Sequence, residues 1–138
     1  MTTARRNNYQ ENPGHARSMG AVIKKVARLK GVQPSEVSTE DIALYAAWSS
    51  SAESLNILAA HEDETVRYAV AHNYDTPQAV LFQLARDRDE LVRAGVVRNE
   101  ALSPALIAVL RADPSPYVRH LLAEYVGYYL SRTQAGVR

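Results

Sequence analysis

The segment Asp87-Arg-Asp-Glu-Leu-Val-Arg93 is the strongest structural signal in the chain, because related segments stand at equal distances on both sides of it. His61-Glu-Asp-Glu-Thr-Val-Arg67 precedes it by 26 residues, and Asp113-Pro-Ser-Pro-Tyr-Val-Arg119 follows it by 26. Further residues keep the same spacing: Leu55, Leu81 and Ile107; Leu58, Leu84 and Leu110; Asp63, Asp89 and Ser115; Val70, Val96 and Leu122. Self-similarity at a fixed short period indicates a repeat architecture.

Each 26-residue unit has the pattern of two short helices. Thr76 and Ser103 each stand before a proline, which is the order expected of an N-cap and a first helical residue. Asp63 and Asp89 have the residue type that caps the start of a second helix, and Asn99 suits a helix end in the left-handed conformation. We therefore expect an all-α chain, a short right-handed α-solenoid of helical-pair repeats of about 26 residues.

The length and composition fit one domain. A chain of 138 residues, 46% of them hydrophobic, can bury a sizeable core without metals or disulfides. We expect residues 1–16 to form a flexible basic arm and residues 17–138 to form a single helical repeat domain. Within it, a capping helix is expected over 17–31, repeats over about 38–125, and a C-terminal capping helix to about 131.

The three repeated segments resemble the turn and second-helix start of HEAT repeats. The Asn-x-x-Thr-Pro pattern that ends at Pro77, together with the short period, is more similar to the leucine-rich repeat variant, a relative of that class. The resemblance covers about residues 50–125. It implies a stack of helical pairs, and it specifies almost nothing about function.

Arg67, Arg93 and Arg119 occupy equivalent positions, so a stack of repeats would align them as an arginine ladder. The resemblance to HEAT-like stacks implies that these arginines pair with turn aspartates, for which the candidates are Asp63, Asp87, Asp89 and Asp113. The planar guanidinium suits such pairs because it can bind a carboxylate through two parallel hydrogen bonds. The alternative is a basic row that follows a phosphate backbone, extended by Arg86, Arg88, Arg98 and Arg111.

Charge is uneven along the chain although the net charge is only +1. Residues 1–33 carry seven basic side chains and one acidic one, whereas residues 34–75 carry eight acidic side chains and one basic one. The basic segment is either the solvated face of a capping helix or a contact for phosphates or an acidic partner. Its candidate nucleic-acid contacts are Arg5, Arg6, Lys24, Lys25 and Arg28.

Tyrosine dominates the aromatic residues, with eight tyrosines against one phenylalanine and one tryptophan. Tyr125, Tyr128 and Tyr129 cluster near the C-terminus, where they either cap the last repeat or make a contact with a second copy of the chain or another partner. The single tryptophan, Trp48, is expected in the core, and the alternative of a pocket residue has no matching partner residues.

Metal, cofactor and catalytic signals are weak. The chain has no cysteine, and His15, His61, His72 and His120 do not show the spacing of a helical metal site, so we expect neither metal nor cofactor. Phosphate-loop, dinucleotide-binding and nucleophile-elbow motifs are missing, so we do not expect an enzyme. No run of 18 apolar residues and no apolar leader occurs, which predicts a cytoplasmic protein without membrane contact.

These observations predict a non-catalytic recognition module. The partner is expected to be a protein, bound in a groove lined by the second helices of the repeats. The expected groove residues are Arg67, Tyr68, Ala71, Arg93, Val97, Arg119 and His120. Tyr68 with His72, four residues apart, is either a recognition patch or an ordinary helix surface, and so is His120 with Glu124. The alternative function is nucleic-acid binding through the basic N-terminal segment and the arginine ladder.

Overall fold

The computed structural model describes residues 13–135, and their side chains from residue 19 to residue 132. This part of the chain is all-helical and contains no strand. Its elements are α1 (Pro13–Lys30), the 3-10 turn η2 (Pro34–Glu36), α2 (Thr39–Trp48), α3 (Ala52–Leu58), α4 (Glu64–His72), α5 (Gln78–Leu84), α6 (Glu90–Val97), α7 (Pro104–Arg111) and α8 (Pro116–Ala135).

Both terminal helices are longer than the sequence predicts. Helix α1 begins at Pro13 and not at residue 17, so the last four residues of the expected flexible arm are helical. Proline is favourable there because its missing N–H leaves no intrahelical bond unmade in the first turn. Helix α8 continues to Ala135, beyond the expected end near residue 131. Residues 1–12 of the predicted arm lie outside the described part of the chain.

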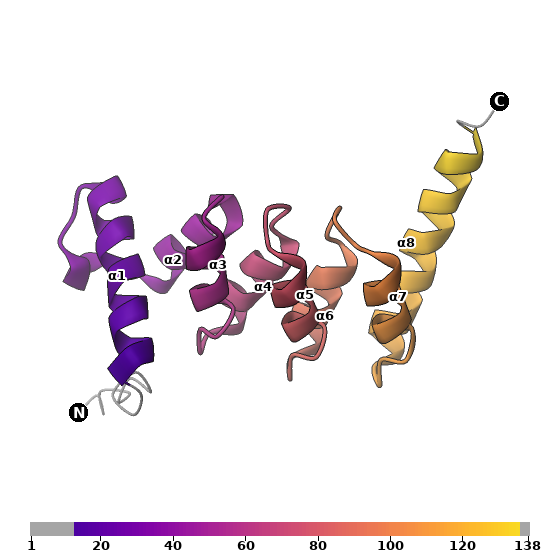
Figure 1. Ribbon diagram of the computed structural model, residues 1–138, viewed down its shortest axis with the longest axis horizontal. Helices are drawn as coiled ribbons and strands as arrows, with labels where there is room; N and C mark the ends of the chain where they lie inside the picture. Colours follow the sequence, from indigo (N-terminus) through magenta and orange to yellow (C-terminus); the bar gives the residue numbers. More distant parts are fainter. Residues whose placement is uncertain (1–12, 136–138) are drawn as a thin grey trace.

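The helices follow one another along the long axis of the molecule, with α1 at one end and α8 at the other (Figure 1). Helices α2, α4, α6 and α8 contact each other in succession, while α3, α5 and α7 each pack on the helix that follows them. Helix α1 contacts both α2 and α3 at its end of the row. One cluster of buried apolar side chains runs from Met19 of α1 to Leu122 of α8.

Short polar side chains fix where the helices begin. Asp63 accepts a hydrogen bond from the amide of Thr65 at 2.8 Å, and Asp89 accepts one from the amide of Leu91 at 2.7 Å, as predicted for N-caps. Ser103 caps α7 in the same way. The prediction for Thr76 was wrong, because α5 begins one residue later than expected and the Thr76 hydroxyl donates to a carbonyl oxygen of α4.

The asparagines at the ends of α4 and α6 have a different role from the predicted one. No residue other than glycine has a positive φ in the described chain, so Asn99 does not adopt the left-handed conformation. Its side-chain Nδ2 donates to the carbonyl oxygens of Ala71 and Asn73, both at 2.8 Å. Asn73 repeats this arrangement with the carbonyl oxygens of Ala46 and Ser49. Each asparagine therefore bonds the end of the preceding even-numbered helix, whose last carbonyls lack intrahelical donors.

Candidate functional site

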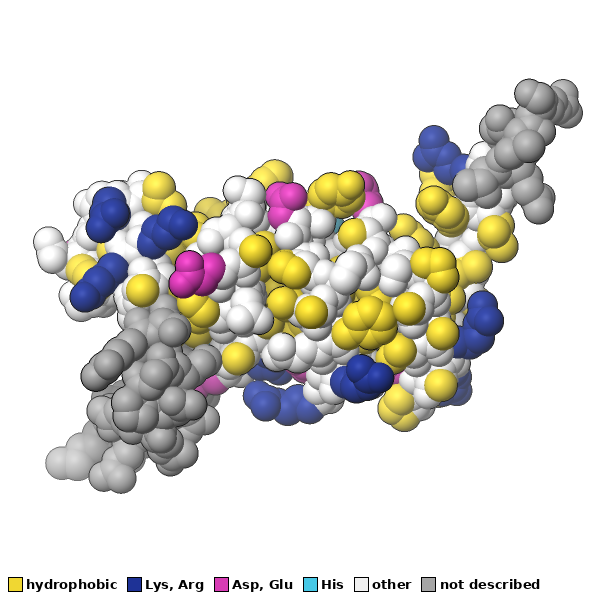
Figure 2. All heavy atoms as spheres, in the orientation of Figure 1, with side chains coloured by type: hydrophobic (Ala, Val, Ile, Leu, Met, Phe, Trp, Pro, Cys, Tyr) yellow, Lys and Arg dark blue, Asp and Glu magenta, His cyan; other side chains and the backbone are white. Residues whose placement is uncertain are grey.

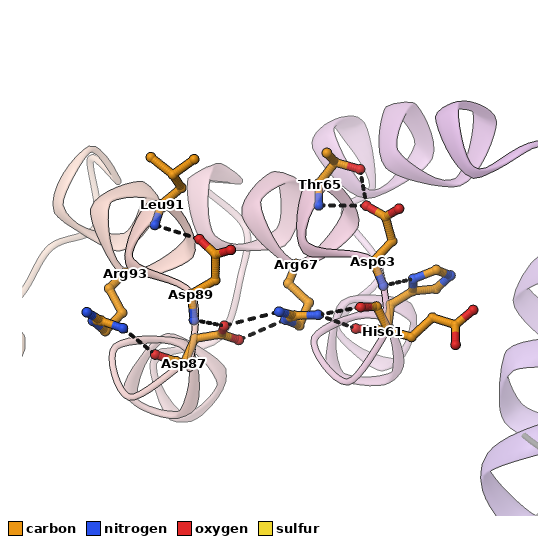
Figure 3. Close-up of polar contacts among 9 residues, drawn as sticks. His61, Asp63, Thr65, Arg67, Asp87, Asp89, Leu91 and Arg93 are labelled. Atoms are coloured by element: carbon orange, nitrogen blue, oxygen red, sulfur yellow. Dashed lines mark hydrogen bonds and ion pairs between the residues drawn. The ribbon is translucent and has the colours of Figure 1, made fainter. Parts of the chain in front are cut away.

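Arg67 of the arginine ladder is buried, and Figure 3 shows the contacts that its guanidinium makes. Its Nε donates to Asp87 Oδ2 at 2.9 Å and its Nη2 to Asp87 Oδ1 at 3.2 Å. Its Nη1 donates to the carbonyl oxygens of His61 and Glu62 at 2.8 and 2.9 Å. Only 5% of the residue is exposed. The guanidinium is thus occupied by a carboxylate and two carbonyls and presents no row to a phosphate backbone.

Arg93 makes the equivalent contacts one unit later. Its Nε donates to Asp113 Oδ2 at 2.7 Å, and its Nη1 donates to the carbonyl oxygen of Asp87 at 2.7 Å. Asp87 and Asp113 also accept bonds from backbone amides two residues ahead, so both carboxylates are held in place. The predicted pairing with turn aspartates is confirmed for Arg67 and Arg93, with Asp87 and Asp113 as the partners.

Arg119 differs from the other two members of the ladder. It is exposed, and its Nη1 donates to the carbonyl oxygen of Asp113 at 2.6 Å. Among the described residues, no carboxylate lies within ion-pair distance of its guanidinium. For Arg67 and for Arg93, the paired aspartate comes 20 residues later in the sequence.

Two residues of the expected groove cannot line it. Ala71 and Val97 are fully buried in the apolar core cluster, where Ala71 lies against Gly95 of α6. Arg67 and Arg93 are withdrawn from the groove by the ion pairs described above. His120 remains on the surface, where its Nε2 lies 3.2 Å from Glu124 Oε1.

A surface that sequence analysis missed surrounds Trp48. The expectation of a core tryptophan was wrong, since 82% of Trp48 is exposed. The buried stripe of α2 passes through Ile42 and Ala46, and Trp48 follows Ala46 by two residues, about 200° around the helix. Tyr74, in the loop after α4, is 65% exposed. A pocket of about 520 Å³ lies at this surface, lined by Ala47, Trp48, His72, Asn73, Tyr74, Asp75, Arg98 and Glu100.

Arg98 connects this pocket to two further tyrosines. Its Nη1 donates to the Tyr68 hydroxyl at 3.5 Å and its Nη2 to the Tyr117 hydroxyl at 3.3 Å. The hydrogen bond with Tyr68, followed by that with Tyr117, outweighs burial and raises the pKa of Arg98 above its ordinary value. The Tyr68 ring also stacks on His72, with centroids 6.0 Å apart. We call this continuous surface the aromatic face, made of Trp48, Tyr68, His72, Tyr74, Arg98 and Tyr117.

Gly95 allows the aromatic face to sit close to the backbone of α6. A Cβ atom at Gly95 would lie 3.0 Å from the Tyr68 ring and 3.1 Å from the Ala71 Cβ, which is closer than ordinary contact. The missing side chain therefore lets α4 approach α6 and sets the position of the Tyr68 ring. No local signal in the sequence distinguishes a packing glycine such as Gly95 from alanine on a buried helix face.

The basic residues of α1 form a second exposed region. Lys24, Lys25 and Arg28 are all on the surface, and Figure 2 shows dark blue side chains gathered over the α1 end. Lys30 is paired, because its Nζ lies 2.7 Å from Asp41 Oδ2. That hydrogen bond, assisted by the Ser38 amide, lowers the pKa of Asp41 to about 2. Arg5 and Arg6 lie outside the described residues.

The three C-terminal tyrosines divide between core and surface. Tyr125 is half-buried against the core, and burial, then Glu100 and Tyr129, raise its pKa. Tyr129 stacks on Tyr125 with centroids 6.5 Å apart, and Tyr128 is 62% exposed and accepts a hydrogen bond from Arg132. The homodimer contact through these residues stays a prediction.

The described part of the chain contains neither a candidate metal site nor a membrane-spanning helix. Among the side chains that the structure describes, residues 19–132, no three His, Asp or Glu residues are grouped as a metal site would require. None of the helices in that range combines the length and the apolar character needed to cross a membrane. Comparison of the chain with protein-family models, curated protein sequences and solved structures found no match.

Proposed function

We propose that the chain is a short right-handed α-solenoid, similar to the leucine-rich repeat variant, and that it binds a protein partner without catalysis. The observation that carries this proposal is the aromatic face, where Trp48 and Tyr74 are largely exposed beside an open pocket. Tryptophan, tyrosine and arginine are the residue types enriched among those that dominate the energy of protein interfaces.

The side chains of the aromatic face are better placed to contact a partner than to stabilise the fold. Removing Trp48 from water would recover roughly 2 kcal/mol or more for a side chain of this size, and the described fold leaves most of that area exposed. Arg98 and Tyr68 hold one another in place, so little conformational entropy remains to be lost when a partner binds. Asp75 and Glu100 at the pocket edge add carboxylates that favour a partner with a basic side chain beside an apolar one.

The test compares partner capture by the wild-type chain, Trp48→Ala, Tyr74→Ala and the control Tyr128→Ala. Tyr128 is an aromatic residue of α8 that is not part of the aromatic face, and it is 62% exposed against 65% for Tyr74. Captured proteins are quantified by mass spectrometry, and folding is checked by circular dichroism. We expect Trp48→Ala and Tyr74→Ala to weaken capture of the same protein by roughly 30-fold each, as for a hot-spot residue. Equal capture by all four chains would contradict the proposal.

Nucleic-acid binding is the second candidate, and the exposed basic surface of α1 favours it. Replacing Lys24, Lys25 and Arg28 by glutamine should abolish a mobility shift with DNA or RNA and flatten its salt dependence, because phosphate contacts release counterions. A chain that shifts neither DNA nor RNA at low salt excludes this function. Variants of Arg67 or Arg93 are unsuitable here, since their ion pairs are part of the interior.

A further inference from the structure

A groove at the α8 end of the molecule, which we call the end groove, is separate from the aromatic face. It has a volume of about 530 Å³ and combines apolar and basic side chains. Its lining residues are Arg111, Arg119, Leu122, Ala123, Val126, Gly127 and Leu130. Leu130 is 53% exposed and Val126 is half-buried, so this part of the apolar wall is open to water, whereas Leu122 beneath it is almost fully buried.

Comparison with Arg67 and Arg93 shows that Arg119 differs from them in having no aspartate partner among the described residues. Each ladder arginine donates through Nη1 to the carbonyl oxygen of the residue six positions earlier, at 2.8 Å for Arg67, 2.7 Å for Arg93 and 2.6 Å for Arg119. Arg67 and Arg93 then donate through Nε and Nη2 to one carboxylate. Arg119 thus shares the backbone contact of the other two arginines, but among the described residues its Nε and Nη2 have no carboxylate partner equivalent to Asp87 or Asp113.

The segments that supply those aspartates share a sequence pattern. Asp87 follows Leu81 and Leu84 at the end of α5, and Asp113 follows Ile107 and Leu110 at the end of α7. Both therefore read apolar-x-x-Leu-x-x-Asp. The two leucines before the aspartates are almost fully buried, so each segment brings an apolar helix face together with its carboxylate. The end groove offers the complementary pair of features, an apolar wall and Arg119, which has no carboxylate partner among the described residues.

We propose that the end groove binds a helix of a protein partner that carries the sequence apolar-x-x-Leu-x-x-Asp. The two apolar side chains pack on the wall around Leu122, Val126 and Leu130, and the aspartate carboxylate accepts hydrogen bonds from Arg119 Nε and Nη2. Such bidentate, charge-assisted bonds add orientation as well as attraction. The end groove and the aromatic face have different residues, so a negative result at one surface does not contradict the proposal for the other.

A second copy of the chain is not the expected occupant. The segment that a head-to-tail neighbour would offer first is Leu55-x-x-Leu58-x-x-His61, in which histidine replaces the aspartate. Helix α1 also packs on α3, which carries that segment. The pattern with aspartate occurs in α5 and α7, where it is already used inside the fold.

The probe for the test is a peptide with the sequence of residues 101–117, which contains the pattern that ends at Asp113. A lactam staple between the positions of Ala108 and Ala112, both exposed in α7 and its C-cap, keeps the short peptide helical. The peptide is titrated into the isotope-labelled full chain and followed by NMR. We expect shifts at the Arg119 side chain and at the amides around Leu122 and Val126. The matched peptide with asparagine in place of the aspartate should bind roughly ten-fold more weakly.

Variants of the full chain separate the ion pair from general attraction. Arg119→Gln should bind both peptides equally weakly, whereas the control Arg132→Gln, outside the end groove, should keep the preference for aspartate. Three results would overturn the proposal: no shifts in the groove at millimolar peptide, equal affinity of the two peptides for the wild-type chain, or an Arg119 shift that inorganic phosphate reproduces at the same concentration. The last result would identify an unspecific anion site.

Discussion

Replacing Arg67 by methionine should destabilise the fold far more than the same change at Arg119. Methionine keeps much of the side-chain length but removes the charge and every donor. In the interior this leaves Asp87, whose side chain is 9% exposed, without its counter-ion, and leaves two carbonyl oxygens without their donor. Breaking a buried ion pair by removing one partner costs about 3–5 kcal/mol. Arg119→Met removes one bond of an exposed side chain, and we expect a loss of about 1 kcal/mol or less.

Urea denaturation followed by circular dichroism measures both free energies of unfolding. With a slope of about 1–3 kcal/mol per molar urea, the midpoint of Arg67→Met should fall by roughly 1–3 M or more, and that of Arg119→Met by much less. The double variant Arg67→Met with Asp87→Asn should lose less than the sum of its single variants, because no unpaired charge remains buried. Equal losses for Arg67→Met and Arg119→Met would refute the structural role of the interior pairs.

Three further changes test other parts of the structure. Asn99→Ala should lower the free energy of unfolding by about 3 kcal/mol, because two buried carbonyl oxygens lose their donor. Urea denaturation measures this loss, and a much smaller loss would mean that water replaces the side-chain amide of Asn99. Lys30→Met should raise the pKa of Asp41 from about 2 toward 3.8, as followed by NMR of the carboxyl carbon; an unchanged pKa would contradict the ion pair. Because the folded pKa of Asp41 lies below its ordinary value, the contribution of this carboxylate is complete above about pH 4 and is lost as the pH falls toward 2. Gly95→Val should lower the free energy of unfolding by about 1–3 kcal/mol, because the new side chain collides with the Tyr68 ring, and Gly95→Ala should lower it by less. If both variants are as stable as wild type, α4 and α6 can move apart without cost, and the close packing at Gly95 is unimportant.

The sequence predicted those features that depend on residues close in the chain or on the period itself. Asp63 and Asp89 were identified as caps because an N-cap bonds an amide only two residues away. The pairing of Arg67 and Arg93 followed from the resemblance and from the regular return of acidic turns. Helix type and order followed from the apolar periodicity, which survives in every unit.

Features that depend on distant partners were missed. Asn99 was assigned a local turn because its acceptor Ala71 lies 28 residues earlier, beyond any local pattern. Trp48 was placed in the core from its residue type alone, although its position beyond the buried stripe of α2 could have been found from the helical period. The difference between Arg119 and Arg67 depends on a carboxylate partner from outside the local segment, and the repeat pattern alone treated the three arginines as equal.

The ladder also determines how the molecule would respond to being pulled from its two ends. Contacts run almost entirely between neighbouring helices, so a force along the long axis passes through each boundary between units in turn. Two of these boundaries are held by ion pairs, Arg67 with Asp87 and Arg93 with Asp113. Each arginine donates two hydrogen bonds to one carboxylate, which resists separation of the units. Arg119 has no equivalent ion pair among the described residues. The C-terminal part of α8 projects from the row of helices (Figure 1). Under tension the parts of the row outside these two boundaries, including the distal end of α8, should therefore separate before the boundaries that the two ion pairs hold together.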